Sequence, residues 1–246
     1  MTNDVMAVRI KKLKRKIQKL MKFRMRLMLK IAAAKSNGIE EEKLLSDSEN
    51  KSICEMDSPK NGLILLASHP GVGKRSFALS LAAKEMALHH RQVVFLIDDS
   101  SGIDVTEIAS EARRLNRDGK LDLLIIDSLN TIKWSDAPNC SDAINKVLCM
   151  LKALAKELQI RIIVLDLLDY LEGENVCGRP QLSDIRDQGI DEQNTDAIWL
   201  LDRKFIWTNR IEDERSAELI IVNPNSGTEK VVPLCYDVEN EVFVFP

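Results

Sequence analysis

His69-Pro-Gly-Val-Gly-Lys-Arg-Ser-Phe77 is the stretch that decides the fold class of this 246-residue chain. It follows a short apolar run, Leu63–Ala67, and leads into a segment of helical composition that starts at Ser76. A strand, a turn that ends in Gly-Lys and a helix form the setting in which backbone N–H groups and a helix N-terminus hold phosphate oxygens. Glycines suit the tight backbone, and the lysine would neutralise the phosphates. The sequence therefore predicts a nucleotide-binding loop, with the candidate residues Pro70, Gly71, Val72, Gly73, Lys74, Arg75 and Ser76.

Two positions in and beside this loop depart from the general pattern. Ser68 stands where a further glycine is expected, and Arg75 stands where a Ser or Thr hydroxyl would ligate Mg²⁺. A guanidinium only donates hydrogen bonds, so Arg75 could pair with a phosphate but cannot ligate a cation. Ser76 lies one residue further, which rotates it by about 100° around a helix, so it cannot take the same place. We therefore expect weakened magnesium binding.

An acidic residue that could serve the same loop ends the apolar run Leu121–Asp127. A carboxylate at the end of a strand beside a phosphate loop is placed to hold Mg²⁺ through water. Asp127 is therefore a candidate metal-binding and catalytic residue. The alternative for Asp127 is an ordinary surface carboxylate at a strand end.

Apolar runs and helical segments alternate along the rest of the chain. Helices are expected at 76–89, from Asp104 onward and at 141–158, and Asp104-Val-Thr-Glu107 has the pattern of a capping box. Near-continuous apolar strands separated by helices are typical of a parallel sheet covered on both faces. We predict an α/β fold, with a mostly parallel sheet flanked by helices and hairpin-like antiparallel strands at the C-terminus. The expected strands are Leu63–Ala67, Val93–Ile97, Leu121–Asp127, Arg161–Leu165, Ala197–Leu201, Leu219–Val222, Val231–Tyr236 and Val242–Phe245.

The N-terminal segment differs in composition from the body. Residues 5–38 contain twelve Lys or Arg and no Asp or Glu, whereas residues 39–246 carry 23 basic and 37 acidic residues, a formal net charge of −14. Residues 1–35 are predicted to form one long basic helix with apolar residues at heptad spacing. Residues 36–61 are acidic and rich in turn formers, which predicts a flexible linker before a domain at 62–246. The apolar seam of the helix consists of Ile10, Leu13, Ile17, Leu20, Leu27, Ile31 and Ala34.

Four interpretations of this basic helix stay open. It could dock on a protein partner or a neighbouring subunit, bind phosphates of DNA or RNA, lie on a membrane surface or act as a mitochondrial targeting peptide. Like charges four residues apart weaken an isolated helix, so the helix is expected to need a partner. The candidate residues for contact with DNA or a partner are Lys12, Arg15, Lys16, Lys19, Lys22 and Arg26.

Cysteine usage and hydropathy exclude several classes of protein. The five cysteines include no Cys-x-x-Cys pair and the only histidines are His69, His89 and His90, which predicts neither a disulfide framework nor a zinc site. Reduced thiols are typical of a cytoplasmic protein. No run of about eighteen apolar residues is present, so no membrane span is expected.

Several stretches of the body, together with the loop, match the motifs of one known family. They are Ile97-Asp-Asp-Ser-Ser-Gly-Ile103, Thr106-Glu107, Ala112-Arg-Arg114, Leu151–Leu158, Arg179-Pro180, Ser183–Arg186 and Gly189–Asp196. From about Gly62 to Phe245 the chain resembles the RecA-like C-terminal domain of DnaB-type replicative helicases. This resemblance implies a P-loop core that binds ATP and Mg²⁺, contact with DNA, and a role in DNA replication beside a helicase, replication proteins or further copies of the chain.

The resemblance also exposes three further departures in the chemistry. Two family strands look fused into Gln92–Ser101, so Asp99 is the candidate in place of a catalytic Glu, with a loop-capping role as the alternative. Leu167 stands where the family has a glutamine that senses the γ-phosphate. Asn223 and Asn225 stand where the family extends a Lys and an Arg into the neighbouring subunit's site. Since each change affects a different part of one transition state, we expect hydrolysis to be impaired.

Three functions are compatible with these patterns. A nucleotide-binding protein that no longer hydrolyses, and that docks on a helicase or another replication protein, agrees best with the departures. An active, hexameric ATP-dependent replicative DNA helicase is the first alternative. A nucleic-acid binder that uses only its basic helix is the second, and its binding would fall steeply with salt.

Overall fold

The computed structural model describes residues 61–88, 90–97, 102–119, 121–133, 140–168 and 178–244. The predicted basic helix at 1–35, nearly all of the predicted linker and Asp99 lie outside these residues. Among the residues described, no helix is both long enough and apolar enough to cross a membrane.

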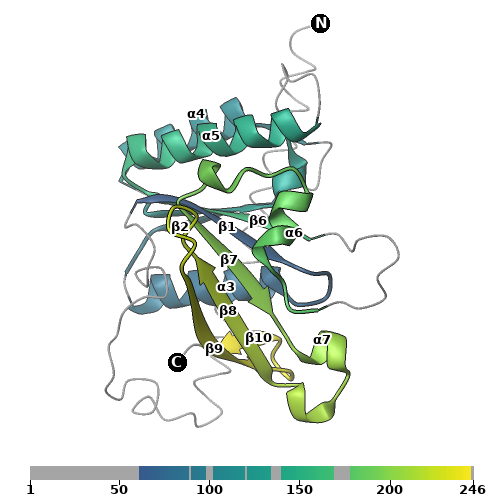
Figure 1. Ribbon diagram of the computed structural model, residues 1–246. Helices are drawn as coiled ribbons and strands as arrows, with labels where there is room; N and C mark the ends of the chain where they lie inside the picture. Colours follow the sequence, from purple (N-terminus) through teal and green to yellow (C-terminus); the bar gives the residue numbers. More distant parts are fainter. Residues whose placement is uncertain are drawn as a thin grey trace, which may run out of the picture. The chain divides into compact units, whose positions relative to one another are not determined.

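One eight-stranded sheet forms the centre of the body, with the strand order β10-β9-β8-β7-β1-β6-β4-β2 (Figure 1). The five strands β7, β1, β6, β4 and β2 pair in parallel with one another. β8 pairs antiparallel with β7, and β9 and β10 extend the sheet in the same antiparallel manner. The predicted mostly parallel sheet with antiparallel C-terminal strands is confirmed. The strands are β1 Gly62–Ser68, β2 Val93–Ile97, β4 Leu123–Asp127, β6 Arg161–Leu167, β7 Ala197–Asp202, β8 Ser216–Val222, β9 Glu229–Asp237 and β10 Val242–Val244.

Strand β1 is buried on both of its faces. Leu63 and Leu65 belong to one hydrophobic core, and Ile64 and Leu66 belong to another, as expected because successive side chains of a strand point to opposite faces. All four side chains are 0 % exposed. Burial on both faces is why this run is continuously apolar rather than alternating.

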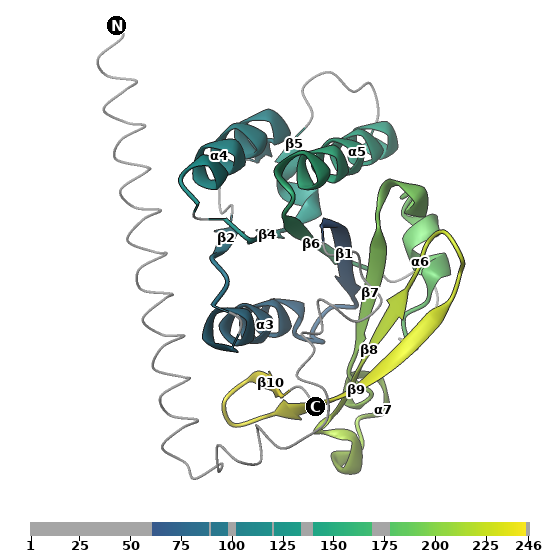
Figure 2. The ribbon, with the colours of Figure 1, turned by 90° about the vertical axis from the view of Figure 1, so that its left-hand side faces the viewer.

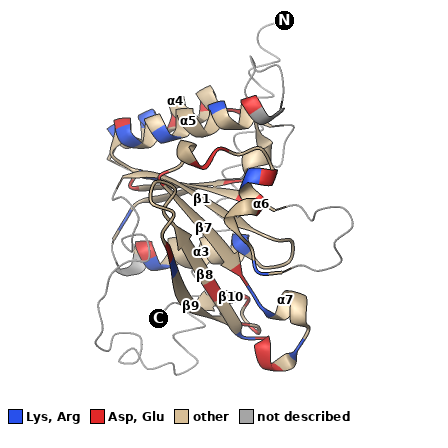
Figure 3. Ribbon diagram, in the orientation of Figure 1, with Lys and Arg blue, Asp and Glu red and all other residues tan. Residues whose placement is uncertain are grey.

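Helices cover the two faces of the sheet. α4 (Val105–Arg117) and α5 (Cys140–Leu158) cover the first core, and α3 (Lys74–Leu88) covers the second. Figure 2 shows α4 and α5 on one side of the sheet and α3 on the other, next to the edge strand β10. Both basic and acidic residues occur along α4 and α5 (Figure 3), and Arg113 joins the two helices through hydrogen bonds of 2.7 and 2.6 Å to Glu157.

The start of α4 is capped differently from the prediction. Asp104 is the N-cap, and its Oδ1 accepts hydrogen bonds from the backbone N–H of Thr106 at 2.8 Å and from the Thr106 hydroxyl at 2.5 Å. The predicted capping box, which would involve Glu107, is therefore wrong. An N-cap side chain can accept a hydrogen bond from the backbone N–H of either the second or the third helical residue. The helix therefore still begins where it was expected.

Several short elements connect the strands and were not predicted. Each has six residues or fewer, which is too short to show a helical or strand period in the sequence. They are α6 Leu182–Asp187, α7 Phe205–Thr208, the two-stranded parallel pair β3 Ile103–Asp104 and β5 Ile132–Lys133, and the 3-10 turns η2 Leu129–Thr131, η3 Glu192–Asn194 and η4 Ile211–Asp213.

Candidate nucleotide-binding site

The predicted phosphate loop connects the carboxyl end of β1 to the first turn of α3. Gly71 has φ +79° and Gly73 has φ +100°, a backbone conformation that glycine adopts without a steric cost. The N–H of Phe77 donates to the carbonyl of Gly73 at 2.9 Å, which closes the first turn of α3. No acidic residue lies in that first turn. The loop therefore has the backbone that an anion at a helix N-terminus requires.

The loop residues differ in how deeply they are buried. Val72 is 1 % exposed and belongs to the core under α3, so it fixes the loop to the body. Lys74 and Ser76 are half-buried, whereas the side chain of Arg75 is 62 % exposed. The polar side chains at the start of α3 thus lie at the surface of the body, on an anchored loop.

Asp127 ends β4, which is separated from β1 by β6 alone. Its side chain is 4 % exposed, so it is not the ordinary surface carboxylate that was the alternative. Nε of Arg75 donates a hydrogen bond to Oδ2 of Asp127, and the two groups form an ion pair. Arg75, which stands where a metal-ligating hydroxyl was expected, therefore pairs with the carboxylate that was predicted to hold the metal.

The donor set of this site does not fit Mg²⁺. The ion requires six oxygen ligands in near-ideal octahedral geometry, and Arg75 offers only N–H donors. At an effective dielectric constant of about 20, two unit charges about 4 Å apart interact by roughly 4 kcal/mol, so a divalent ion beside the guanidinium would meet roughly twice that repulsion. Within the described part of the chain, no group of three or more His, Cys, Asp or Glu residues could hold a metal ion instead.

Leu167, at the end of β6, stands where a glutamine that senses the γ-phosphate was expected. A different glutamine, Gln188, contacts this strand end. Leu167 is half-buried at the end of β6, and its carbonyl accepts a hydrogen bond of 2.8 Å from Nε2 of Gln188. Gln188 follows α6, and the same helix approaches the loop, since Asp184 Oδ2 lies 3.9 Å from His69 Nε2. Sequence reasoning missed Gln188 because it lies 21 residues away in a segment without a regular period. Asp99 lies outside the described residues.

Asn223 and Asn225, which were predicted to stand in place of two cations of the family, lie in the turn between β8 and β9. Oδ1 of Asn223 accepts hydrogen bonds from the backbone N–H groups of Asn225, at 2.9 Å, and Ser226, at 3.3 Å. Nε2 of Gln193 donates to the carbonyl of Pro224 at 3.0 Å. An Asn side chain that bonds the backbone two residues on is a turn-forming device. The amide of Asn223 therefore stabilises its own turn.

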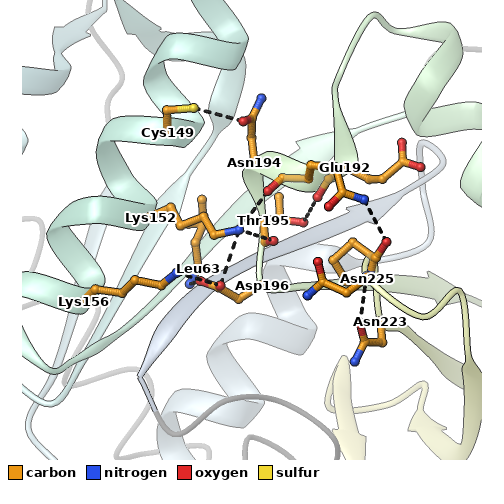
Figure 4. A network of polar contacts seen from close by, with 12 residues as sticks. Leu63, Cys149, Lys152, Lys156, Glu192, Asn194, Thr195, Asp196, Asn223 and Asn225 are labelled. Atoms are coloured by element: carbon orange, nitrogen blue, oxygen red, sulfur yellow. Dashed lines mark hydrogen bonds and ion pairs between the residues drawn. The ribbon is translucent and has the colours of Figure 1, made fainter.

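Two lysines of α5 hold the segment that precedes β7 (Figure 4). Nζ of Lys152 donates to the carbonyls of Gln193 and Thr195, both at 2.8 Å. Lys152 and Lys156 each lie 3.4 Å from Oδ1 of Asp196, whose Oδ2 accepts from the N–H of Leu63 at 2.9 Å. This network joins α5 to the start of β1. The two sides of the network lie in the stretches Leu151–Leu158 and Gly189–Asp196 that carry the family resemblance, but the sequence did not indicate that they contact each other.

Aromatic residues from the C-terminal strands border the loop. The ring of Phe243 in β10 lies 5.0 Å from that of Tyr236 in β9 and would lie 3.4 Å from a Cβ placed on Gly73. The guanidinium carbon of Arg203 lies 3.5 Å from the centre of the Tyr236 ring. The backbone N–H of Phe243 donates to the Ser80 hydroxyl of α3 at 3.1 Å. The last hairpin is thereby fixed against the first turns of α3.

Burial raises the pKa of Asp202, which ends β7, although Trp207 Nε1 donates to its carboxylate at 3.3 and 3.4 Å. The stabilising contribution of Asp202 is therefore present below its unfolded pKa of about 3.9 and is lost as the pH rises through the higher folded pKa. We expect Asp202→Asn to gain stability relative to the wild type as the pH rises from about 4 to 7. Urea unfolding across this pH range measures the difference. Glu239→Gln, at an exposed turn, is the control, and parallel curves for Asp202→Asn and the wild type would contradict the prediction.

A glycine-rich loop after a central parallel strand, with a carboxylate at the end of the strand two positions away in the sheet, defines a P-loop protein with a RecA-like core. Residues 89–244 match the family model described as the DnaB-like helicase C terminal domain, so the chain belongs to that family. The predicted family and fold are confirmed.

Curated relatives match the chain over part of their length. The replicative DNA helicase DnaC of Bacillus subtilis is 33 % identical over 150 residues, which are 60 % of this chain and 33 % of the relative. The replicative DNA helicase DnaB of Pasteurella multocida is 36 % identical over 147 residues, which are 58 % of this chain and 31 % of the relative. The chain thus spans about a third of the length of these relatives.

Two solved structures share the fold. One is an ATPase domain that superposes with a TM-score of 0.69 at 23 % identity, covering 88 % of this chain and 98 % of that domain. The other, a DnaB-like replicative helicase solved for its interactions with primase, also has a TM-score of 0.69, at 21 % identity, covering 93 % of this chain and 76 % of that chain. At this identity the likeness concerns the fold alone.

Proposed function

We propose that this chain is a DnaB-like helicase-domain protein of DNA replication that binds a nucleotide, no longer hydrolyses it, and acts by docking on a replicative helicase or another replication protein. The single observation that carries the proposal is the ion pair between Arg75 and Asp127. The site thus has a phosphate loop of suitable backbone, but the ion pair makes the Asp127 carboxylate unavailable to a metal. Such a site can hold phosphates but lacks a means of placing the metal for their transfer.

Two further sites support the loss of hydrolysis. Leu167 presents an apolar side chain at the end of β6, where a γ-phosphate would need a polar group. Asn223 uses its side chain in the β8–β9 turn and carries no charge toward a neighbouring subunit. A cation supplied to a phosphoryl-transfer site is worth roughly 10³–10⁵ in rate, so its loss alone would nearly silence turnover.

Docking is proposed from the arrangement of the chain. A basic helix at 1–35 and a linker at 36–61 would precede the domain at 62–246, and the apolar seam of that helix suits packing against another helix. A related DnaB-like helicase interacts with primase, so a replicative helicase, primase or a further copy of this chain are the candidate partners. We place the protein in the cytoplasm, with DNA contact through the basic helix as a secondary role.

The test combines ATP turnover with co-purification. We expect the full chain, with Mg²⁺ and single-stranded DNA, to release phosphate from ATP no faster than Lys74→Ala, because both lack a complete site. We also expect it to co-purify with the replicative helicase of its own organism, and deletion of residues 1–35 to abolish this association.

Two variants of the basic helix distinguish its modes of contact. Asp at Ile17 and Leu20 disrupts the apolar seam, whereas Gln at Lys16 and Lys19 removes only charge. If the helix docks through its apolar seam, the variant with Asp at positions 17 and 20 should no longer co-purify with the helicase. The variant with Gln at positions 16 and 19 should still co-purify with it. The reverse result, with loss of DNA binding, would indicate a plain nucleic-acid binder.

An active ATP-dependent replicative DNA helicase is the second candidate. The observation that favours it is the intact loop backbone, with Gly71 and Gly73 in the conformations given above and Asp127 buried at the end of β4. Phosphate release that Lys74→Ala abolishes would establish this function and overturn the proposal.

A further inference from the structure

Arg75 and Asp127 meet at the position where a P-loop protein has a hydroxyl, a carboxylate and Mg²⁺ between them. Arg75 comes from the first turn of α3, and Asp127 from the end of β4, 52 residues away in the sequence. One partner is nearly buried and the other is largely exposed. The buried carboxylate of Asp127 therefore fixes Nε of Arg75, while the rest of this largely exposed side chain remains at the surface.

The hydrogen-bonding pattern of Arg75 leaves donors for a ligand. Among the residues that the structure describes, Arg75 bonds to the protein through Nε alone. The terminal nitrogens carry the other N–H donors of the planar guanidinium, whose fork matches two phosphate oxygens. Lys74 precedes it, and the first turn of α3 contains no acidic residue that would repel an anion.

We propose that Arg75, held by Asp127, is a built-in cation that replaces Mg²⁺, so that the loop binds the phosphates of a metal-free nucleotide. This inference rests on the proposed nucleotide binding and names the form of the ligand. The ligand class is a nucleoside di- or triphosphate without its usual divalent ion. The ion's two functions, neutralising phosphate charge and linking the phosphates to Asp127, both pass to the guanidinium.

The effect of Mg²⁺ on binding then has the opposite sign from that in an ordinary P-loop protein. In excess Mg²⁺, a nucleotide carries the ion on its terminal phosphate oxygens. That ion would lie beside the guanidinium and be repelled by it. Free nucleotide is therefore preferred. Arg75→Thr would restore the oxygen ligand and release Asp127, so this variant should prefer the magnesium complex of the nucleotide.

The experiment is a calorimetric titration of the full chain with the non-hydrolysable ATP analogue AMP-PNP and with ADP, each in EDTA and in excess Mg²⁺. Wild type is expected to bind at least as tightly in EDTA as in Mg²⁺. Arg75→Thr should bind in EDTA roughly 10- to 100-fold more weakly than wild type, the loss expected for charged hydrogen bonds, and should recover in Mg²⁺. Arg75→Lys keeps the positive charge but lacks the planar fork, so, like the wild type, it should bind no more tightly in Mg²⁺ than in EDTA. Arg117→Thr, at an exposed position on α4, is the matched control and should behave as wild type.

A second readout follows the ion directly. Electron paramagnetic resonance of Mn²⁺, used as a probe in place of Mg²⁺, should show no protein-bound ion for wild type with AMP-PNP and a bound ion for Arg75→Thr. Tighter wild-type binding in Mg²⁺, or Mn²⁺ bound by wild type, overturns the inference and leaves the proposed nucleotide binding standing. Absence of nucleotide binding by wild type in both buffers overturns the inference together with that nucleotide binding, while docking is judged separately by co-purification. The wild-type affinities in EDTA and in Mg²⁺, together with the Mn²⁺ spectrum of the wild type, test the inference even if a variant fails to fold.

Discussion

Replacing Phe77 by alanine is expected to lower the free energy of unfolding by about 3–5 kcal/mol, the largest loss of any single change considered for this chain. Phe77 is 0 % exposed on the inner side of α3. Its ring lies edge-on to Trp199 of β7, with 6.3 Å between centroids, and to Phe243 of β10, with 5.5 Å. Alanine would leave a cavity in the core that attaches the phosphate loop to the sheet. Thermal unfolding followed by circular dichroism should show a melting temperature roughly 10 °C lower.

Two further variants make this expectation specific. Ile211→Ala changes an apolar side chain that is 85 % exposed, so its stability should stay within about 0.5 kcal/mol of wild type. Phe243→Ala removes one of the two ring partners and leaves the other, so its loss should be smaller than that of Phe77→Ala. A loss below about 1 kcal/mol for Phe77→Ala would mean that the core under α3 is less tightly packed than its burial indicates.

The strands could be predicted from the sequence because the sheet is covered on both faces. Each central strand is a continuous apolar run, and β2 begins and ends at the predicted residues. The ends of other strands depend on tertiary pairing. β4 starts at Leu123, two residues later than expected, and the N–H of Asp122 before it donates to the carbonyl of Gln92, which precedes the neighbouring strand β2. β6 extends past a buried aspartate to pair with the end of β1, which a hydropathy pattern cannot show.

The loop could be predicted, but its pairing with Asp127 could not. The motif residues are consecutive, so their order alone indicates a phosphate loop. The sequence offered only a phosphate as the partner of Arg75, whereas the structure pairs its Nε with Asp127. Only the strand order, which places β4 two positions from β1, brings these groups together. Arg75 in the motif already predicted weakened magnesium binding, but the engagement of Asp127, the candidate metal-binding carboxylate, follows only from that contact.

Replacing Gly73 by alanine is expected to weaken nucleotide binding by roughly 10- to 100-fold, which corresponds to a backbone strain of about 1–3 kcal/mol. Gly73 has φ +100°, beyond the left-handed region near +57° that other residues occasionally adopt. An added Cβ would also lie 3.4 Å from the ring of Phe243. The alanine variant must either keep this strain or turn the peptide, which moves backbone N–H groups away from the phosphates. Titration with AMP-PNP in EDTA measures the loss.

Gly119→Ala separates this local effect from general destabilisation. Gly119 also has a positive φ, +65°, but it lies beyond the end of α4, where an added Cβ meets nothing within 4 Å. We expect that variant to lose about 1 kcal/mol of stability and none of its nucleotide affinity. Equal affinities for Gly73→Ala and wild type would show that the loop backbone does not bind the phosphates. Binding would then have to depend on the side chains of Lys74 and Arg75 alone, and the exposed guanidinium would be a surface anion site rather than part of a P-loop.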